Sequence, residues 1–195
     1  MWIKTLLAAL AGLLCGSALA ALLVFGPVEI GGTQTGPWKT NLLIGDPSAS
    51  PMVRAAIARR GLLALNRSET VYFNATSDDR GEALRENCSY RVYFERQPDT
   101  RWWSLTLYAA DDYLAVNGDN AHSVTAEDAA ASAGNPISVM VAASRPDAAA
   151  HWMSSRHAGN FALTLRLYQP DAAISENPVL AALPVIEQLS CEGEA

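Results

Sequence analysis

The side chains that could carry chemistry in this chain lie on two predicted strands. Thr106 and Tyr108 alternate with leucines in the first, and Thr164, Arg166 and Tyr168 alternate with leucines in the second. If the two strands share a sheet, their polar faces meet as a patch of hydroxyls around one guanidinium. A guanidinium stacks on aromatic rings or grips a carboxylate with two hydrogen bonds. This pattern predicts a small pocket for an anionic or sugar-like ligand.

Other aromatic and polar residues are candidates for the walls and the rim of this pocket. The candidate walls are Trp102, Trp103 and Trp152, and the candidate rim is Asn117 and Ser123. The other interpretation, and the one that we favour from the sequence, is that Arg166 forms an internal ion pair and only holds the fold together. In that case its candidate partners are Glu69, Glu95 and Asp111.

Known catalytic and metal-binding motifs do not occur in the sequence. It contains no Gly-rich phosphate loop, no Gly-x-Ser-x-Gly and no His-Glu-x-x-His. The histidines and the acidic pairs have neither metal-ligand spacing nor the arrangement of a base facing a nucleophile. These residues are His122, His151, His157, Asp111-Asp112 and Glu127-Asp128. We therefore predict no catalytic residues, no metal and no cofactor.

Strands are the main elements that must position these residues. Apolar and polar side chains alternate with a period of two, and the candidate strands are 70–75, 89–94, 103–109, 137–142, 161–168 and 184–189. Helical crossovers between them are missing, which argues against a parallel α/β sheet. One short helix is expected after Ser50, its candidate N-cap, with Pro51 in the first position, and residues 126–133 could form a helical turn. We predict an antiparallel β-sandwich.

The first 28 residues predict a transmembrane anchor. Residues 5–28 carry no charge, and a 24-residue helix is about 36 Å long, whereas the hydrocarbon core of a bilayer is about 30 Å thick. Lys4 favours a cytoplasmic N-terminus. Twelve arginines against two lysines, together with many alanines, are typical of proteins from GC-rich bacterial genomes. The predicted location is therefore the bacterial inner membrane, crossed once, with the C-terminal domain in the periplasm. The alternative is a signal peptide cleaved near Ala18-Leu19-Ala20, which would release the domain into the periplasm.

The rest of the chain divides into an irregular linker, residues 29–50, which packs on the domain, and a domain over residues 51–195. Together they hold 13 basic and 20 acidic side chains, a net charge of −7. This balance argues against nucleic acid as a partner and gives no polybasic patch for a membrane surface.

Cys88 and Cys191 are the only cysteines beyond the predicted anchor. In an oxidising compartment such a pair predicts one disulfide. Two unrelated buried thiols are the alternative.

Four segments of the sequence are specific enough to indicate a family. They are RWWSLTLYAADDYLAVN (residues 101–117) and NFALTLRLYQP (160–170), together with residues 36–73 and ENCSYRVYF (86–94). These segments resemble the bacterial domain of unknown function 1214 family, in particular its short, membrane-anchored members. The resemblance covers about residues 36–191. It implies a jelly-roll type of sandwich, and it implies no chemistry.

Export, acidity and the missing catalytic motifs favour a non-catalytic binding or scaffolding module of the cell envelope. The alternative is an envelope hydrolase whose site is assembled from separate strands around Arg166, because such sites leave no local motif. A third possibility is an assembly subunit whose exposed aromatic residues contact an envelope protein.

Overall fold

The computed structural model describes residues 2–25, 32–59, 64–131 and 136–192. Its strands are β1 (Thr33–Thr35), β2 (Trp38–Thr40), β3 (Thr70–Ala75), β4 (Cys88–Phe94), β5 (Thr100–Tyr108), β6 (Ser123–Thr125), β7 (Ile137–Ala142), β8 (His151–Ser154), β9 (Ala162–Pro170) and β10 (Val185–Cys191). Its helices are α1 (Trp2–Phe25), α2 (Pro51–Arg59), α3 (Ala126–Ala131), α4 (Ala172–Glu176) and the 3-10 turn η1 (Pro178–Leu180).

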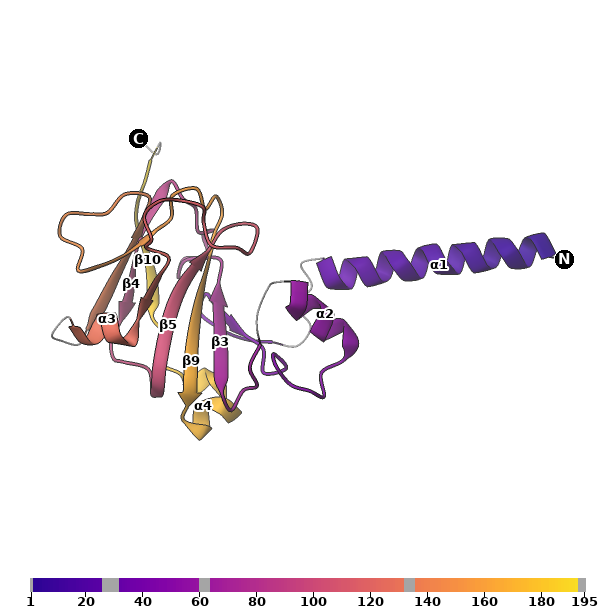
Figure 1. Ribbon diagram of the computed structural model, residues 1–195, viewed down its shortest axis with the longest axis horizontal. Coiled ribbons are helices and arrows are strands. Elements are labelled where there is room, and N and C mark those ends of the chain that lie inside the picture. Colours follow the sequence, from indigo (N-terminus) through magenta and orange to yellow (C-terminus); the bar gives the residue numbers. More distant parts are fainter. Residues whose placement is uncertain (1, 26–31, 60–63, 132–135, 193–195) are drawn as a thin grey trace.

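The strands form two sheets, with few helices around them (Figure 1). The six-stranded sheet has the order β1-β2-β3-β9-β5-β6, and the four-stranded sheet has the order β10-β4-β7-β8. The mainly β prediction is confirmed. All six predicted strands are present, and β3 and β7 have the predicted bounds. Strong alternation of apolar and polar residues therefore located the strands that carry most of the core.

The linker predicted over residues 29–50 is less irregular than expected. It contains β1 and β2, which pair antiparallel, with Gly36 in the left-handed region (φ +57°) at the turn between them. Trp38 of β2 is buried, and its indole N–H donates to the carbonyl of Pro184 at 2.7 Å. This segment is therefore built into the domain. The predicted boundary at residues 28–29 lies outside the described residues.

One strand pair departs from the antiparallel prediction. Residues 151–154, which were not among the predicted strands, form β8, and β8 pairs parallel with β7. Parallel neighbours usually need a long crossover. Here the chain only has to return from Ala142 to the level of Val139, which pairs with His151, so a loop of eight residues is long enough.

A single core lies between the two sheets. The six-stranded sheet contributes alternate residues of β3, β9 and β5, and the four-stranded sheet contributes alternate residues of β4 and β7. Trp103 of β5 stacks on Phe94 of β4 with ring centroids 4.9 Å apart. Tyr90 of β4 meets Phe161 edge-on at 5.7 Å. The inward faces of both sheets are thus fully used for packing, and any ligand site must lie elsewhere.

The predicted disulfide is present between Cys88 and Cys191. The two residues are direct Cα partners on β4 and β10, and they are 103 residues apart in the sequence. The bond therefore ties the last strand of the chain to the middle of the domain. The third cysteine, Cys15, is free and exposed on α1.

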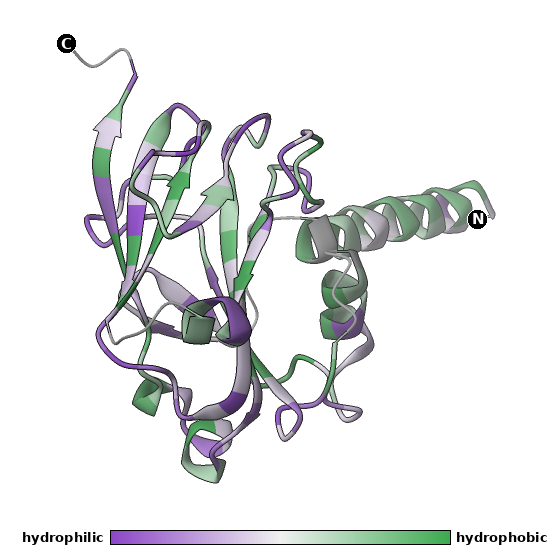
Figure 2. Ribbon diagram, turned by 60° about the vertical axis from the view of Figure 1, so that its left-hand side comes forward, coloured by the Kyte–Doolittle hydropathy of each residue, from purple (hydrophilic) through white to green (hydrophobic). Residues whose placement is uncertain are grey.

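Helix α1 stands apart from both sheets (Figure 1). Figure 2 shows that it is hydrophobic over most of its length. Residues Trp2–Leu23 are long and apolar enough to cross a membrane, with a mean hydropathy of 2.3 and none of the span buried in the protein. A signal sequence has the same properties, so the fold agrees with both alternatives for this segment.

The two predicted helical segments are also confirmed. The N-terminus of α2 is capped as expected, because the Ser50 hydroxyl accepts a hydrogen bond from the Val53 amide at 3.3 Å. Residues 126–131 of the second segment form α3, and residues 132–133 lie outside the described residues.

Neighbouring tryptophans of β5 give a test of the two sheet faces. Trp103 lies in the core at 1% exposure, whereas Trp102 lies on the opposite face. We expect Trp103→Ala to lower the free energy of unfolding by about 3–5 kcal/mol. Trp102→Ala should cost clearly less. Chemical denaturation of both variants measures the difference, and equal losses would contradict the assigned faces.

The disulfide gives a second test. A cross-link that closes a loop of this length typically contributes about 2–4 kcal/mol to stability. We expect the double variant Cys88→Ser/Cys191→Ser to lose this amount in denaturant unfolding, whereas Cys15→Ser should lose nothing. Intact mass measured without reductant should show two hydrogens fewer than the reduced chain. A mass that corresponds to three free thiols would refute the pairing.

Candidate functional site

The predicted polar patch lies on the outer face of the six-stranded sheet. Directly opposed residues of neighbouring antiparallel strands project to the same face. Arg166 of β9 is opposite Tyr72 of β3 on one side and Ser104 of β5 on the other. The next row of the face contains Asn74, Thr164, Thr106 and Ser123. Four strands that are distant in the sequence therefore place their polar side chains in one patch.

Arg166 is the centre of this patch. Its Nη1 donates to the Thr106 hydroxyl at 3.3 Å, and its Nη2 donates to the Tyr108 hydroxyl at 2.8 Å. The guanidinium carbon lies 5.4 Å from the centre of the Tyr108 ring and 5.9 Å from that of the Tyr72 ring. The side chain is half-buried. Two rings and two hydroxyls thus hold the guanidinium in a defined orientation.

Within the described residues, no carboxylate lies within ion-pair distance of Arg166. The three acidic residues considered as internal partners, Glu69, Glu95 and Asp111, are all exposed, and none pairs with it. Other arginines do have carboxylate partners: Arg80, Arg85, Arg91, Arg96 and Arg156. Withdrawing a cation from water is costly unless an anion compensates for it. The structure therefore argues against the internal ion pair as the role of Arg166.

The patch offers hydrogen-bond donors. A guanidinium has five N–H groups, and Arg166 uses two of them on described residues. Because the hydroxyls of Thr106 and Tyr108 accept these bonds, their own O–H protons can point to a ligand. The Thr164 hydroxyl donates to Asn74 Oδ1 at 2.7 Å, which leaves the Asn74 amide hydrogens as further donors. Many donors beside one positive charge suit a carboxylate, phosphate or sulfate group.

An aromatic pair borders the patch on the side of α3. The rings of Trp102 and Tyr168 lie 5.0 Å apart at an angle of 59°. The Trp102 indole N–H donates to the carboxylate of Glu127 on α3, and this hydrogen bond lowers the pKa of Glu127. The ring of Trp102 is thereby fixed beside Tyr168 and supplies an apolar edge to the patch.

The structure separates three of the predicted pocket residues from Arg166. Trp103 belongs to the core between the sheets, because it is adjacent in sequence to the outward-facing Trp102 and Ser104. Trp152 is on β8 of the other sheet, where its indole N–H donates to the Ala142 carbonyl at 3.0 Å. Asn117 lies in a loop and donates to the Arg156 carbonyl at 2.9 Å. The walls of the patch are therefore Tyr72, Tyr108 and Trp102.

Sequence reasoning did not include Tyr72 and Asn74 in the site. Both lie on β3, whose outward residues Thr70, Tyr72 and Asn74 show the same period of two as those of β9. That signal was present in the sequence. What was missing was the order of strands, which places β3 beside β9.

The histidines lie apart from one another. His122 precedes β6 and has a buried Nδ1 without a partner among the described atoms, His151 begins β8, and the Nδ1 of His157 lies 3.1 Å from the Val116 carbonyl in a loop. Among the described residues, no group of three or more His, Cys, Asp or Glu side chains is placed to hold a metal ion.

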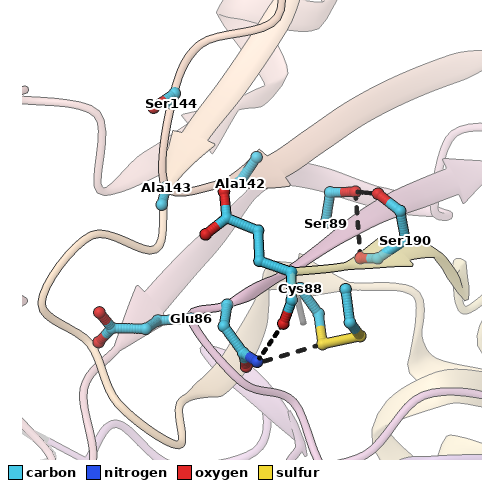
Figure 3. A pocket seen from close by; sticks show the side chains of 10 residues that line it. Glu86, Cys88, Ser89, Ala142, Ala143, Ser144 and Ser190 are labelled. Atoms are coloured by element: carbon cyan, nitrogen blue, oxygen red, sulfur yellow. Dashed lines mark hydrogen bonds between the residues drawn. A yellow bond between two sulfur atoms is a disulfide. The ribbon is translucent and has the colours of Figure 1, made fainter. Parts of the chain in front are cut away.

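A shallow pocket of about 240 Å³ lies at the disulfide, and Figure 3 shows the residues around it. It is bounded by the ends of β4, β7 and β10 in the four-stranded sheet, and two acidic residues, Glu86 and Glu192, lie at its rim. It contains no histidine and no basic side chain. The patch around Arg166 is therefore the better candidate for an anionic ligand.

Comparison with known structures shows the fold but assigns no activity. The crystal structure of the VPA0106 protein from Vibrio parahaemolyticus is similar, with a TM-score of 0.58 and 22% identity over 73% of this chain and 36% of that chain. An uncharacterized protein from Burkholderia cenocepacia matches with a TM-score of 0.47 and 16% identity, over 62% of this chain and 30% of that one. The chain thus spans about a third of the length of each. No curated protein matches it.

Comparison with protein families assigns the chain to one family. Residues 69–172 match the family described as "Protein of unknown function (DUF1214)". These residues include β3, β5 and β9, and with them Arg166 and its aromatic neighbours. The match extends over more than half of the sequence, and the chain belongs to the DUF1214 family.

Proposed function

We propose that this protein is a membrane-anchored binding module of the bacterial envelope that holds an anionic ligand on the outer face of its six-stranded sheet. The observation that carries the proposal is Arg166, whose half-buried guanidinium has neutral hydroxyls and rings around it and no carboxylate partner among the described residues. A ligand anion would supply the missing charge and accept the free donors.

The partial exposure of Arg166 supports binding of a ligand from solution. The side chains of Arg166, Tyr108 and Tyr168 are half-buried, so they can be reached from outside the domain. The small side chains on the same face are buried, namely Ser104, Thr106 and Thr164. The proposed contact with a ligand is therefore made through the guanidinium and the tyrosine side chains beside it. The jelly-roll arrangement implied by the family resemblance would present this face as one of the two outer surfaces of a sandwich.

α1 and the disulfide support the proposed anchor and location. An exposed apolar helix of this length would not stay in water, and Lys4 at its start favours insertion with the N-terminus in the cytoplasm. The domain would then lie in the periplasm, where a disulfide such as Cys88–Cys191 persists.

Extraction of bacterial membranes tests the anchor. We expect the full chain to stay in the membrane pellet after alkaline carbonate treatment, because α1 crosses the hydrocarbon region. Protease added to spheroplasts should degrade the domain. A soluble periplasmic chain that begins after Ala20 would instead show a cleaved signal peptide, and a protected cytoplasmic domain would refute the topology.

Thermal-shift screening of the purified full chain in detergent tests the anion site. The probes are acetate, phosphate, sulfate and a uronic acid. We expect at least one probe to raise the Tm, and Arg166→Gln to weaken its affinity about 10–100-fold, because a charged hydrogen bond is worth about 1.5–3 kcal/mol. Arg101→Gln, which removes an exposed arginine from the same sheet, is the matched control and should change nothing.

Tyr108→Phe keeps the charge and removes one hydroxyl, so it serves if Arg166→Gln does not fold. We expect it to weaken binding severalfold. The proposal fails if no probe stabilises the chain, or if a folded Arg166→Gln variant keeps the full affinity.

A further inference from the structure

The charges of this chain are unevenly divided between the part next to α1 and the rest of the domain. Residues 30–68 contain five basic and one acidic side chain, and with Glu29, which directly precedes them, the net charge is +3. Residues 69–195 contain eight basic and 18 acidic side chains, a net charge of −10. The acidic balance of the whole body, from which we expected no polybasic patch for a membrane surface, conceals this uneven distribution. The structure adds that α2, which belongs to the basic segment, packs against α1.

We propose that this segment, the basic collar (described over residues 32–59 and 64–68), rests on the anionic phospholipid headgroups around the anchor. The proposal rests on α1 being a membrane anchor. It concerns a lipid contact of the collar, and it does not depend on the ligand proposed for Arg166.

The position of α2 supports the contact. α2 packs against α1, and Figures 1 and 2 both show it beside the C-terminal end of that helix. When α1 crosses the bilayer, its C-terminal end emerges among the headgroups on the side of the domain. α2 is then held at the depth of the headgroups.

The surface of the collar has the composition of an interfacial segment. Arg54 on α2 and Arg67 before β3 are exposed. Two apolar side chains, Leu43 and Leu65, are also exposed, to 36% and 43%. Exposed apolar side chains among cations are typical of segments that lie at the boundary of headgroups and acyl chains.

The single acidic residue of the collar, Asp46, is occupied within its own turn. Its Oδ1 accepts hydrogen bonds from the amide and the hydroxyl of Ser48, at 2.7 and 2.6 Å. These bonds lower the pKa of Asp46. It therefore remains charged, and the cations of the collar outnumber it.

The acidic remainder of the domain gives the domain a preferred orientation relative to the bilayer. A body with a net charge of −10 is repelled by an anionic surface, while the collar is attracted to it. Both forces act within about 8–10 Å at physiological salt, so only the part closest to the bilayer feels them strongly. The collar is that part, and the domain is held with its acidic bulk away from the lipid.

A fluorophore at position 65 tests the proposal in the full chain. The label is attached to Leu65→Cys in a Cys15→Ser background, and the chain is reconstituted into vesicles of phosphatidylcholine alone or with 30% phosphatidylglycerol. Acrylamide is uncharged and quenches label that is exposed to water. We expect its quenching constant to fall by about half when phosphatidylglycerol is present, and to recover in 0.5 M NaCl.

Charge-reversal variants separate the collar from the domain. Arg54→Glu should abolish most of the difference between the two lipids. Arg145→Glu, the same change at an exposed arginine outside the collar, should leave it intact. Equal quenching in both lipids, or equal loss in both variants, would overturn the lipid contact. Carbonate extraction of the same samples reports the anchor separately, and the Tm shift with anions reports the ligand site.

Discussion

The alternation of side chains along β9 is the constraint on which this structure depends. The strand runs through the middle of the six-stranded sheet, between β3 and β5. Its leucines, Leu163, Leu165 and Leu167, are completely buried in the core. A period of two then forces Thr164, Arg166 and Tyr168 onto the opposite face. Burying the leucines is what holds an arginine in the middle of an outward-facing sheet surface.

Much of the fold could be predicted because core strands carry a strong period. The six strands whose apolar residues alternate regularly were all found, and so was the helix capped by Ser50. β1, β2, β6 and β8 have only three or four residues each, too few for a period to stand out. The parallel pairing of β8 depends on how a loop returns, and that is decided by tertiary contacts rather than by local pattern.

The candidate site was predicted in part, for a related reason. Residues within one strand could be assigned to a common face, so the grouping of Thr164, Arg166 and Tyr168 was correct. Neighbouring strands could not be ordered, so Tyr72 and Asn74 were missed. The two neighbouring tryptophans show how sensitive the assignment of a residue to a sheet face is. A shift of one residue along β5 separates Trp103, which lies in the core, from Trp102, which lies on the outer face.

The disulfide between Cys88 and Cys191 bears on self-association of the protein through its sheet edge. β10 is the edge of the four-stranded sheet, and β4 lies immediately inside it. An uncovered strand presents unpaired amides and carbonyls that recruit strands from other chains. The disulfide holds the final residue of β10 beside β4, where the end of the strand would otherwise fray. Reduction of the disulfide would therefore free the end of β10, and fraying of β10 would expose the edge of β4 to strands of other chains.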